Sequence, residues 1–108
     1  MTRGSLYWVN LEDASPPELG KTRPAVVLSN SEQNAVLDTV VVVPLSTRAP
    51  SIWPLRIELP ASGKRKRSFA VVPGIRQVDK RRLVGSLGVV SERFLDELTR
   101  ATVAYLGE

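Results

Sequence analysis

Short runs of apolar and β-branched residues, separated by clusters of turn formers, are the main pattern along this sequence. Two runs, 24–29 and 39–45, carry consecutive valine and leucine residues and predict buried strands. In residues 5–11, Leu6, Trp8 and Leu11 alternate loosely with polar neighbours, which together with Tyr7 and Val9 predicts a first strand. Residues 55–59 alternate apolar and charged positions, which predicts a strand with one solvent-exposed face. Trp8 alternates with its neighbours in the first of these strands, so we expect it in the core. Three further short strands are predicted at 68–72, 75–78 and 83–86.

The last part of the sequence changes to a helical period. Ser91 is a suitable N-cap for a helix that continues to Leu106, and Gly107 is suited to end it. Many short strands followed by one helix indicate an α+β fold with an antiparallel, partly closed sheet. A chain of 108 residues is enough for one such domain, 1–108, with a single core. The apolar stripe of the helix contains Phe94, Leu98, Ala101 and Tyr105, beside Leu95, Thr102 and Leu106.

The balance of charges favours an anionic partner. The chain has 15 lysines and arginines against 11 aspartates and glutamates, a formal charge of +4 and a pI near 10.0. This excess suits a ligand rich in phosphate or carboxylate, without choosing between the two. No apolar run approaches the length of a membrane span, and the first residues lack an apolar signal core. We therefore expect a cytoplasmic protein with no membrane partner.

The chain contains neither histidine nor cysteine, which narrows the chemistry available to it. Histidine is the usual general base near neutral pH and the commonest metal ligand, and cysteine is needed for a thiol nucleophile or a disulfide. The carboxylates are scattered along the sequence, and no spacing among them resembles a two-metal nuclease site. We therefore expect neither a metal nor another cofactor.

The stretch 21–29 joins a charged loop directly to a buried strand. Pro24 restricts the residue before it to an extended conformation, so Arg23 should be a positioned guanidinium at the strand entrance. The second buried strand, 39–45, ends in a polar segment, 46–48, with the sequence Ser-Thr-Arg. Two neighbouring buried strands thus each carry polar side chains at one end.

These two segments also carry a family resemblance. Residues 20–30, followed by 42–47, resemble the MazF/PemK-like toxins of bacterial type II toxin–antitoxin systems. The opening residues 3–11 resemble the first strand of that family, and 75–83 resemble its late signature. The resemblance covers nearly the whole chain. It implies an SH3-like, partly open antiparallel β-barrel of the PemK/CcdB type, with a C-terminal α-helix and a two-fold symmetric homodimer.

Two positions depart from the family pattern. Ser5 stands where the family usually has an acidic residue, and Gly74 stands where it usually has glutamine. Neither position belongs to the chemistry that the resemblance implies. The partners that it implies are single-stranded RNA and a cognate antitoxin, whose acidic, disordered tail would cover the RNA groove.

The resemblance implies a sequence-specific, metal-independent endoribonuclease that cleaves single-stranded mRNA to 2′,3′-cyclic phosphate and 5′-hydroxyl ends and so inhibits translation and growth. In such a reaction the site must stabilise charge on the phosphorane oxygens. Arg23 suits this task, because a guanidinium stays protonated and offers a planar fork of donors to phosphate. The family hydroxyl that donates to the same phosphate falls on Ser46, with Thr47 as the neighbouring alternative. The general base is a carboxylate such as Glu18, a water, or simple alignment of the 2′-hydroxyl.

Candidate RNA-binding residues flank the proposed catalytic ones. The run 64–67 places four positive charges in one turn, which could follow an RNA backbone or serve as a solvated loop that protects an edge strand. Trp53 could stack on a base, worth roughly 1–3 kcal/mol, or form a dimer contact or an edge of the core. Arg76 could contact RNA or pair structurally with Asp79. The complete candidate set is Lys21, Thr22, Arg48, Trp53, Lys64, Arg65, Arg76 and Gln77.

Two alternatives remain at the level of sequence. One is a non-enzymatic toxin of the CcdB type that binds DNA gyrase, and the other is an inactive module that binds only RNA or its antitoxin. Gyrase poisons of this type resemble one another in a C-terminal Trp-Gly-Ile, whereas residues 104–108 read Ala-Tyr-Leu-Gly-Glu. This difference, together with Arg23 and Ser46, favours the ribonuclease.

Overall fold

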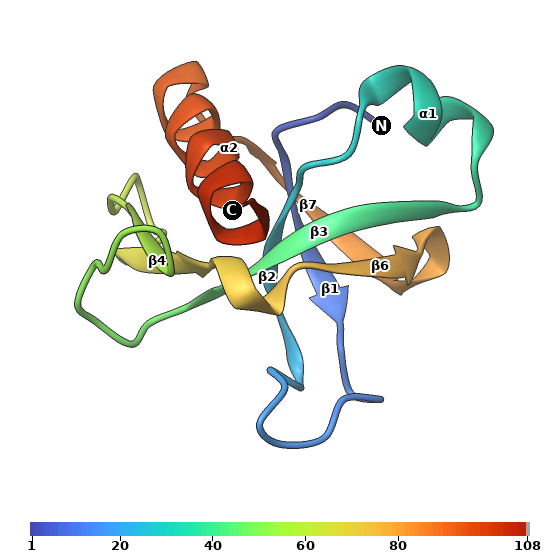
Figure 1. The fold of residues 1–108 in the computed structure, drawn as a ribbon. Helices are drawn as coiled ribbons and strands as arrows, with labels where there is room; N and C mark the ends of the chain where they lie inside the picture. The colour runs from blue at the N-terminus through green and yellow to red at the C-terminus, as the bar shows by residue number, and fades with distance from the viewer. Residues whose placement is uncertain (108) are drawn as a thin grey trace.

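The computed structural model describes residues 1–107 and shows a curved antiparallel sheet with one long helix (Figure 1). The strands are β1 (Ser5–Asn10), β2 (Thr22–Val27), β3 (Thr39–Ser46), β4 (Arg56–Leu59), β5 (Ser68–Val71), β6 (Arg76–Asp79) and β7 (Leu83–Val89). The helical segments are α1 (Ser31–Val36), the 3₁₀ turns η1 (Val72–Gly74) and η2 (Lys80–Arg82), and α2 (Glu92–Leu106). The predicted α+β class and terminal helix are confirmed.

The sheet is a partly open barrel. Its strands follow the order β4-β5-β3-β2-β1-β7, and β6 pairs with the first half of β3. The second half of β3 leaves β6 and pairs with β5, so this one long strand connects the two parts of the sheet. Within residues 1–107, β4 and β7 stand at opposite ends of the pairing order and leave the barrel open between them. This is the expected SH3-like architecture.

Apolar side chains fill both faces of the central strands, because successive strand residues point to opposite sides. On one face, Leu6, Val26 and Val43 pack with residues of α2. On the other face, the second cluster contains Val9, Leu11, Ala25, Val27, Val40, Val42 and Val78. The consecutive valines that predicted buried strands therefore supply two separate layers of core.

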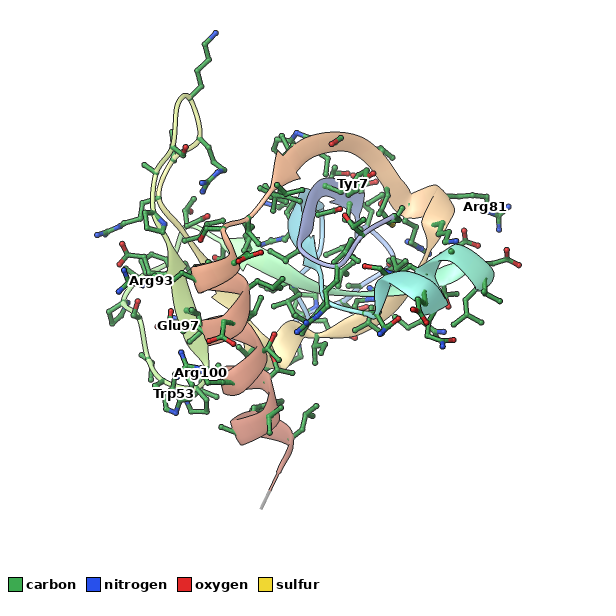
Figure 2. All side chains as sticks on the ribbon, turned by 90° about the horizontal axis from the view of Figure 1, so that it is seen from above. Tyr7, Trp53, Arg81, Arg93, Glu97 and Arg100 are labelled. Carbon is green, nitrogen blue, oxygen red and sulfur yellow. The ribbon has the colours of Figure 1, made fainter. Side chains whose placement is uncertain are left out.

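Helix α2 covers the first core layer. The Ser91 hydroxyl accepts a hydrogen bond from the backbone N–H of Phe94 at 3.1 Å, which confirms the predicted N-cap. Four residues of the predicted stripe are buried: Phe94, Leu98, Ala101 and Thr102. Its last two members, Tyr105 and Leu106, are 40% and 66% exposed, so extending the buried stripe to them was wrong. The final turn projects beyond the sheet, as Figure 2 shows.

Trp8 is not in the core, contrary to the prediction, since 40% of it is exposed. Its cross-strand partners are Pro24 on β2 and Gly85 on β7. Neither partner has a side chain long enough to cover an indole, and a Cβ on Gly85 would lie 3.6 Å from Trp8 Cδ1. The small neighbouring side chains leave this one position of β1 open.

The two departures from the family pattern have structural reasons. Ser5 is only 7% exposed, and its hydroxyl hydrogen-bonds with that of Thr2 at 2.9 Å, so a carboxylate there would be buried. Gly74 lies in η1 against Pro44, where an added Cβ would stand 2.7 Å from the Pro44 Cγ. Both substitutions are therefore matched to their neighbours.

No helix within residues 1–107 is both long and apolar enough to cross a membrane. The longest, α2, has 15 residues.

Candidate active site

A groove of about 890 Å³ lies at the open side of the barrel. Its walls come from β1, β2 and β7 on one side and from the end of β3, the turn between β4 and β5 and the start of β5 on the other. Figure 2 shows the β4–β5 turn projecting away from the body of the molecule. Within residues 1–107, every charged side chain that lines the groove is cationic: Lys21, Arg23, Arg48, Lys64, Arg65 and Lys66. Such a lining concentrates anionic ligands.

Arg23 is the second residue of β2 and is held in place by two backbone carbonyls. Its Nε donates to the Gly20 oxygen at 2.8 Å, and its Nη1 donates to the Leu45 oxygen at 3.3 Å. These bonds orient the guanidinium plane, while Nη2 donates to no other group within residues 1–107. The predicted position at a strand entrance thus gives a half-buried, oriented fork of donors in the groove.

The environment of Arg23 already disfavours its positive charge. Burial in the groove lowers the pKa of the Arg23 guanidinium below its ordinary value, and the charge of Arg48 lowers it further. The group remains protonated at neutral pH, because arginine titrates far above it. An anion bound in the groove would offset both effects, because its negative charge favours the protonated guanidinium.

Ser46 lies beside Arg23 at the end of β3. Ala25 pairs with Pro44 in the antiparallel register of β2 and β3, so two residues further along Arg23 faces Ser46. The Ser46 hydroxyl oxygen accepts from the backbone N–H of Arg48 at 3.2 Å, which leaves its own O–H to donate to a ligand. Thr47 also lines the groove. The structure therefore brings together the three residues that the sequence proposed as catalytic.

The eight candidate RNA-binding residues divide into two groups. Lys21, Arg48, Lys64 and Arg65 line the groove, whereas Thr22, Trp53, Arg76 and Gln77 lie outside its lining. Trp53 is 56% exposed in the loop before β4, and Figure 2 shows it at the end of the β4–β5 hairpin opposite the connecting turn. Gln77 donates to the Thr39 hydroxyl at 2.9 Å, across the β3–β6 pair.

Arg76 makes a structural ion pair, although not with the partner considered from sequence. Its guanidinium donates to both carboxylate oxygens of Asp13, at 3.1 and 3.3 Å, and Arg82 reaches the same carboxylate at 3.0 Å. Asp79 instead accepts from Arg81 at 2.8 Å, so the proposed pairing of Arg76 with Asp79 was wrong. Asp13 thereby ties the loop between β1 and β2 to β6 and η2. That loop supplies the carbonyl of Gly20, which orients Arg23.

The Asp13 ion pairs should make stability depend on pH. The hydrogen bond from Arg76 lowers the pKa of the Asp13 carboxyl below its ordinary value of 3.8. A lowered pKa in the folded state contributes stability above 3.8, and this contribution is lost as the pH falls through the folded-state pKa. We expect wild type to exceed Asp13→Asn in free energy of unfolding near neutral pH, with the difference shrinking below pH 3.8. Urea unfolding of both proteins across this range measures it.

Glu12→Gln, at the neighbouring exposed carboxylate, is the matched control, and it should show no such pH-dependent difference. A difference between wild type and Asp13→Asn that stays constant down to the lowest pH would contradict the proposed role of Asp13.

Trp8 and Ser68 are among the groove residues that the sequence analysis did not propose for the site. The signal for Trp8 was present, since glycine and proline beside a tryptophan on neighbouring strands leave the indole uncovered. That signal required knowing that β1 pairs with β7, which are far apart in sequence. Nothing in the sequence distinguished Ser68, which starts β5, from other strand serines.

The acidic side chains form no metal site among the described residues. Within 1–107, no three histidine, cysteine, aspartate or glutamate side chains gather closely enough to bind an ion together.

An antiparallel α+β barrel with a groove whose charged lining residues, within 1–107, are all cationic defines a class of protein suited to bind an anionic ligand. The sequence profile of the PemK-like, MazF-like toxins of type II toxin–antitoxin systems matches residues 2–106, and the chain belongs to this family.

Related proteins agree with this assignment. The chain is 31% identical over 113 residues to a protein named endoribonuclease MazF9 from Mycobacterium tuberculosis, covering 98% of this chain and 96% of the relative. The structure of this chain is similar to that of MazF from Deinococcus radiodurans, with a TM-score of 0.88 and 28% identity. The match covers 100% of this chain and 97% of the Deinococcus chain. A MazE–MazF structure from the same organism gives a TM-score of 0.78 at 27% identity, with 99% and 95% coverage.

Proposed function

We propose that this protein is an endoribonuclease toxin that cleaves single-stranded RNA at specific sequences without a metal ion. One observation carries the proposal: Arg23, oriented by two carbonyl oxygens, lies opposite Ser46 in a groove lined by positive charge. Family membership and the relatives named as endoribonucleases support it. Inhibition of translation and growth in the cytoplasm would follow from cleavage of mRNA.

In the proposed reaction, the 2′-hydroxyl of the substrate attacks the adjacent phosphorus and the bond to the 5′-oxygen breaks. The 2′-hydroxyl gives one proton to a base, and the departing 5′-oxygen takes one, which leaves a 2′,3′-cyclic phosphate and a 5′-hydroxyl. Arg23 Nη2 and the Ser46 or Thr47 hydroxyl donate to the phosphorane oxygens, where negative charge grows. Among bases considered from sequence, Glu18 lies outside the groove lining, where its carboxylate accepts from the Ser15 N–H at 3.4 Å.

The same groove suits control by an antitoxin. We propose a homodimer that binds a cognate antitoxin whose acidic, disordered tail covers the groove. The cationic side chains at the groove would attract such a tail by electrostatic steering, and the association should weaken with salt. Binding would place the tail where the RNA phosphates otherwise lie.

The reaction is tested by incubating the purified protein with a long RNA of mixed sequence in EDTA and mapping the cut ends by primer extension. We expect discrete cuts with 2′,3′-cyclic phosphate and 5′-hydroxyl ends. A 2′-deoxy nucleotide placed on the 5′ side of a mapped cut should abolish that cut and leave the others unchanged. Cleavage that requires added Mg²⁺, or that continues at the 2′-deoxy position, would exclude this mechanism.

A further inference from the structure

Two buried polar atoms in the groove lack a hydrogen-bond partner. Ser68 is only 8% exposed, and its Oγ makes no hydrogen bond within residues 1–107; the same is true of Arg65 Nη1. A buried donor left without a partner destabilises the folded protein, so such atoms are rare unless a ligand uses them. Both residues line the groove, and both can donate to a phosphate oxygen.

Ser68 lies across from the end of β3, where the proposed catalytic hydroxyls are found. Ser46 pairs with Phe69 in the register of β3 and β5, so the next position along places Thr47 opposite Ser68. A phosphate bound by Ser68 would therefore be a near neighbour of the phosphate that is attacked. Because the Ser68 Oγ is buried, a ligand reaches it only when the side chains that cover it move aside.

Trp8 adds a flat apolar surface to the same groove. Its indole is 40% exposed on a strand whose other apolar residues, Leu6 and Val9, are buried. Pro24 and Gly85 flank it without covering it, and Leu87 and Val89 continue the apolar wall. An exposed indole beside cationic side chains is the arrangement on which nucleic-acid bases stack.

An exposed indole beside cationic and hydroxyl donors favours one kind of ligand. An acidic peptide could pair with the cations but carries no regular series of flat rings, whereas single-stranded nucleic acid alternates bases with phosphates. We propose that Trp8, Arg65 and Ser68 form a nucleotide subsite beside the cleavage site, in which Trp8 stacks on a base and the other two bind an adjoining phosphate. The subsite depends on the proposed function, because that function supplies its substrate, single-stranded RNA.

Tryptophan fluorescence tests the subsite without cleavage. The chain has two tryptophans, Trp8 and Trp53, so a Trp53→Phe protein reports on Trp8 alone. The probe is a mixed-sequence 2′-fluoro oligoribonucleotide, which has no 2′-hydroxyl to attack. We expect saturable quenching of Trp8 emission. In a series with one abasic nucleotide moved along the probe, one position should lose the quenching and bind about ten- to a hundredfold more weakly.

Ser68→Ala tests the phosphate contact. It should weaken binding of the same probe about three- to tenfold, while thermal stability stays equal or rises because an unpaired buried hydroxyl is removed. Ser86→Ala, at an exposed strand serine outside the groove lining, is the control and should leave binding unchanged. Equal binding by wild type and Ser68→Ala would remove Ser68 from the subsite.

The outcomes separate the subsite from the proposed reaction. If the probe quenches Trp8 emission but RNA is not cut, the result supports the subsite and contradicts the proposed reaction. If RNA is cut while the probe leaves Trp8 emission unchanged, the result supports the proposed reaction and contradicts the subsite. Emission that changes with protein concentration and not with the probe would show that a second copy of the chain covers Trp8, which also overturns the subsite.

Discussion

Arg23→Ala is expected to reduce the single-turnover rate of RNA cleavage by about 10³-fold. The replacement removes both the positive charge and the donors that would stabilise the phosphorane in the proposed reaction, and losses of this kind are typical for one essential cationic donor. Binding of the 2′-fluoro probe should fall far less, because five other cationic side chains of the groove remain: Lys21, Arg48, Lys64, Arg65 and Lys66. Quenched-flow or manual time courses with end-labelled RNA measure the rate.

Arg23→Lys separates the charge from the geometry of the guanidinium. Lysine keeps the charge but offers one compact ammonium, which cannot donate to the Gly20 and Leu45 carbonyls and to a phosphate in one plane. We expect it to recover probe binding but little of the cleavage rate. Arg100→Ala, on the exposed face of α2, is the matched control and should cut RNA at the wild-type rate. Cleavage by Arg23→Ala at that rate would refute the assignment of the site.

Leu98→Ala is expected to lower the free energy of unfolding by about 2–5 kcal/mol. Leu98 is fully buried where α2 packs on the first core layer, so its removal loses apolar burial and leaves a cavity between helix and sheet. The groove lies on other elements, so the folded fraction should still cut RNA. Urea unfolding followed by circular dichroism measures the change.

The same helix provides the control for this prediction. Val103→Ala removes a β-branched residue that is 66% exposed, and it should change the free energy of unfolding by less than about 0.5 kcal/mol. If both substitutions had equal small effects, α2 would not be packed on the sheet as described.

Local sequence determined the elements of this fold. Runs of valine predicted the central strands because β-branched side chains suit a buried pleated surface, and Ser91 predicted the start of α2 because its hydroxyl satisfies a free N–H group. Pro24 placed Arg23 at a strand entrance through the restriction that proline imposes on the preceding residue. Each of these effects acts over a few residues and needs no knowledge of distant neighbours.

Pairing between distant segments decided what local pattern could not. Trp8 was expected in the core, but its exposure depends on Gly85, which the β1–β7 pairing brings beside it. Arg76 was considered beside Asp79, yet its partner is Asp13, 63 residues away along the chain. A pattern of alternation specifies which face a residue occupies, but not which residue covers it.

The features of the candidate site also fall into two groups, those that local sequence predicted and those that depend on pairing between distant segments. The sequence by itself determined a basic chain without histidine or cysteine, an arginine held before a buried strand, and hydroxyls at the end of the next strand. Only the tertiary structure decided that Arg23 faces Ser46, that four of the eight candidate RNA contacts share its groove, and that Ser68 is buried there without a partner. The physical reason is that strand register and barrel curvature set these distances, and both arise from packing across the whole sheet.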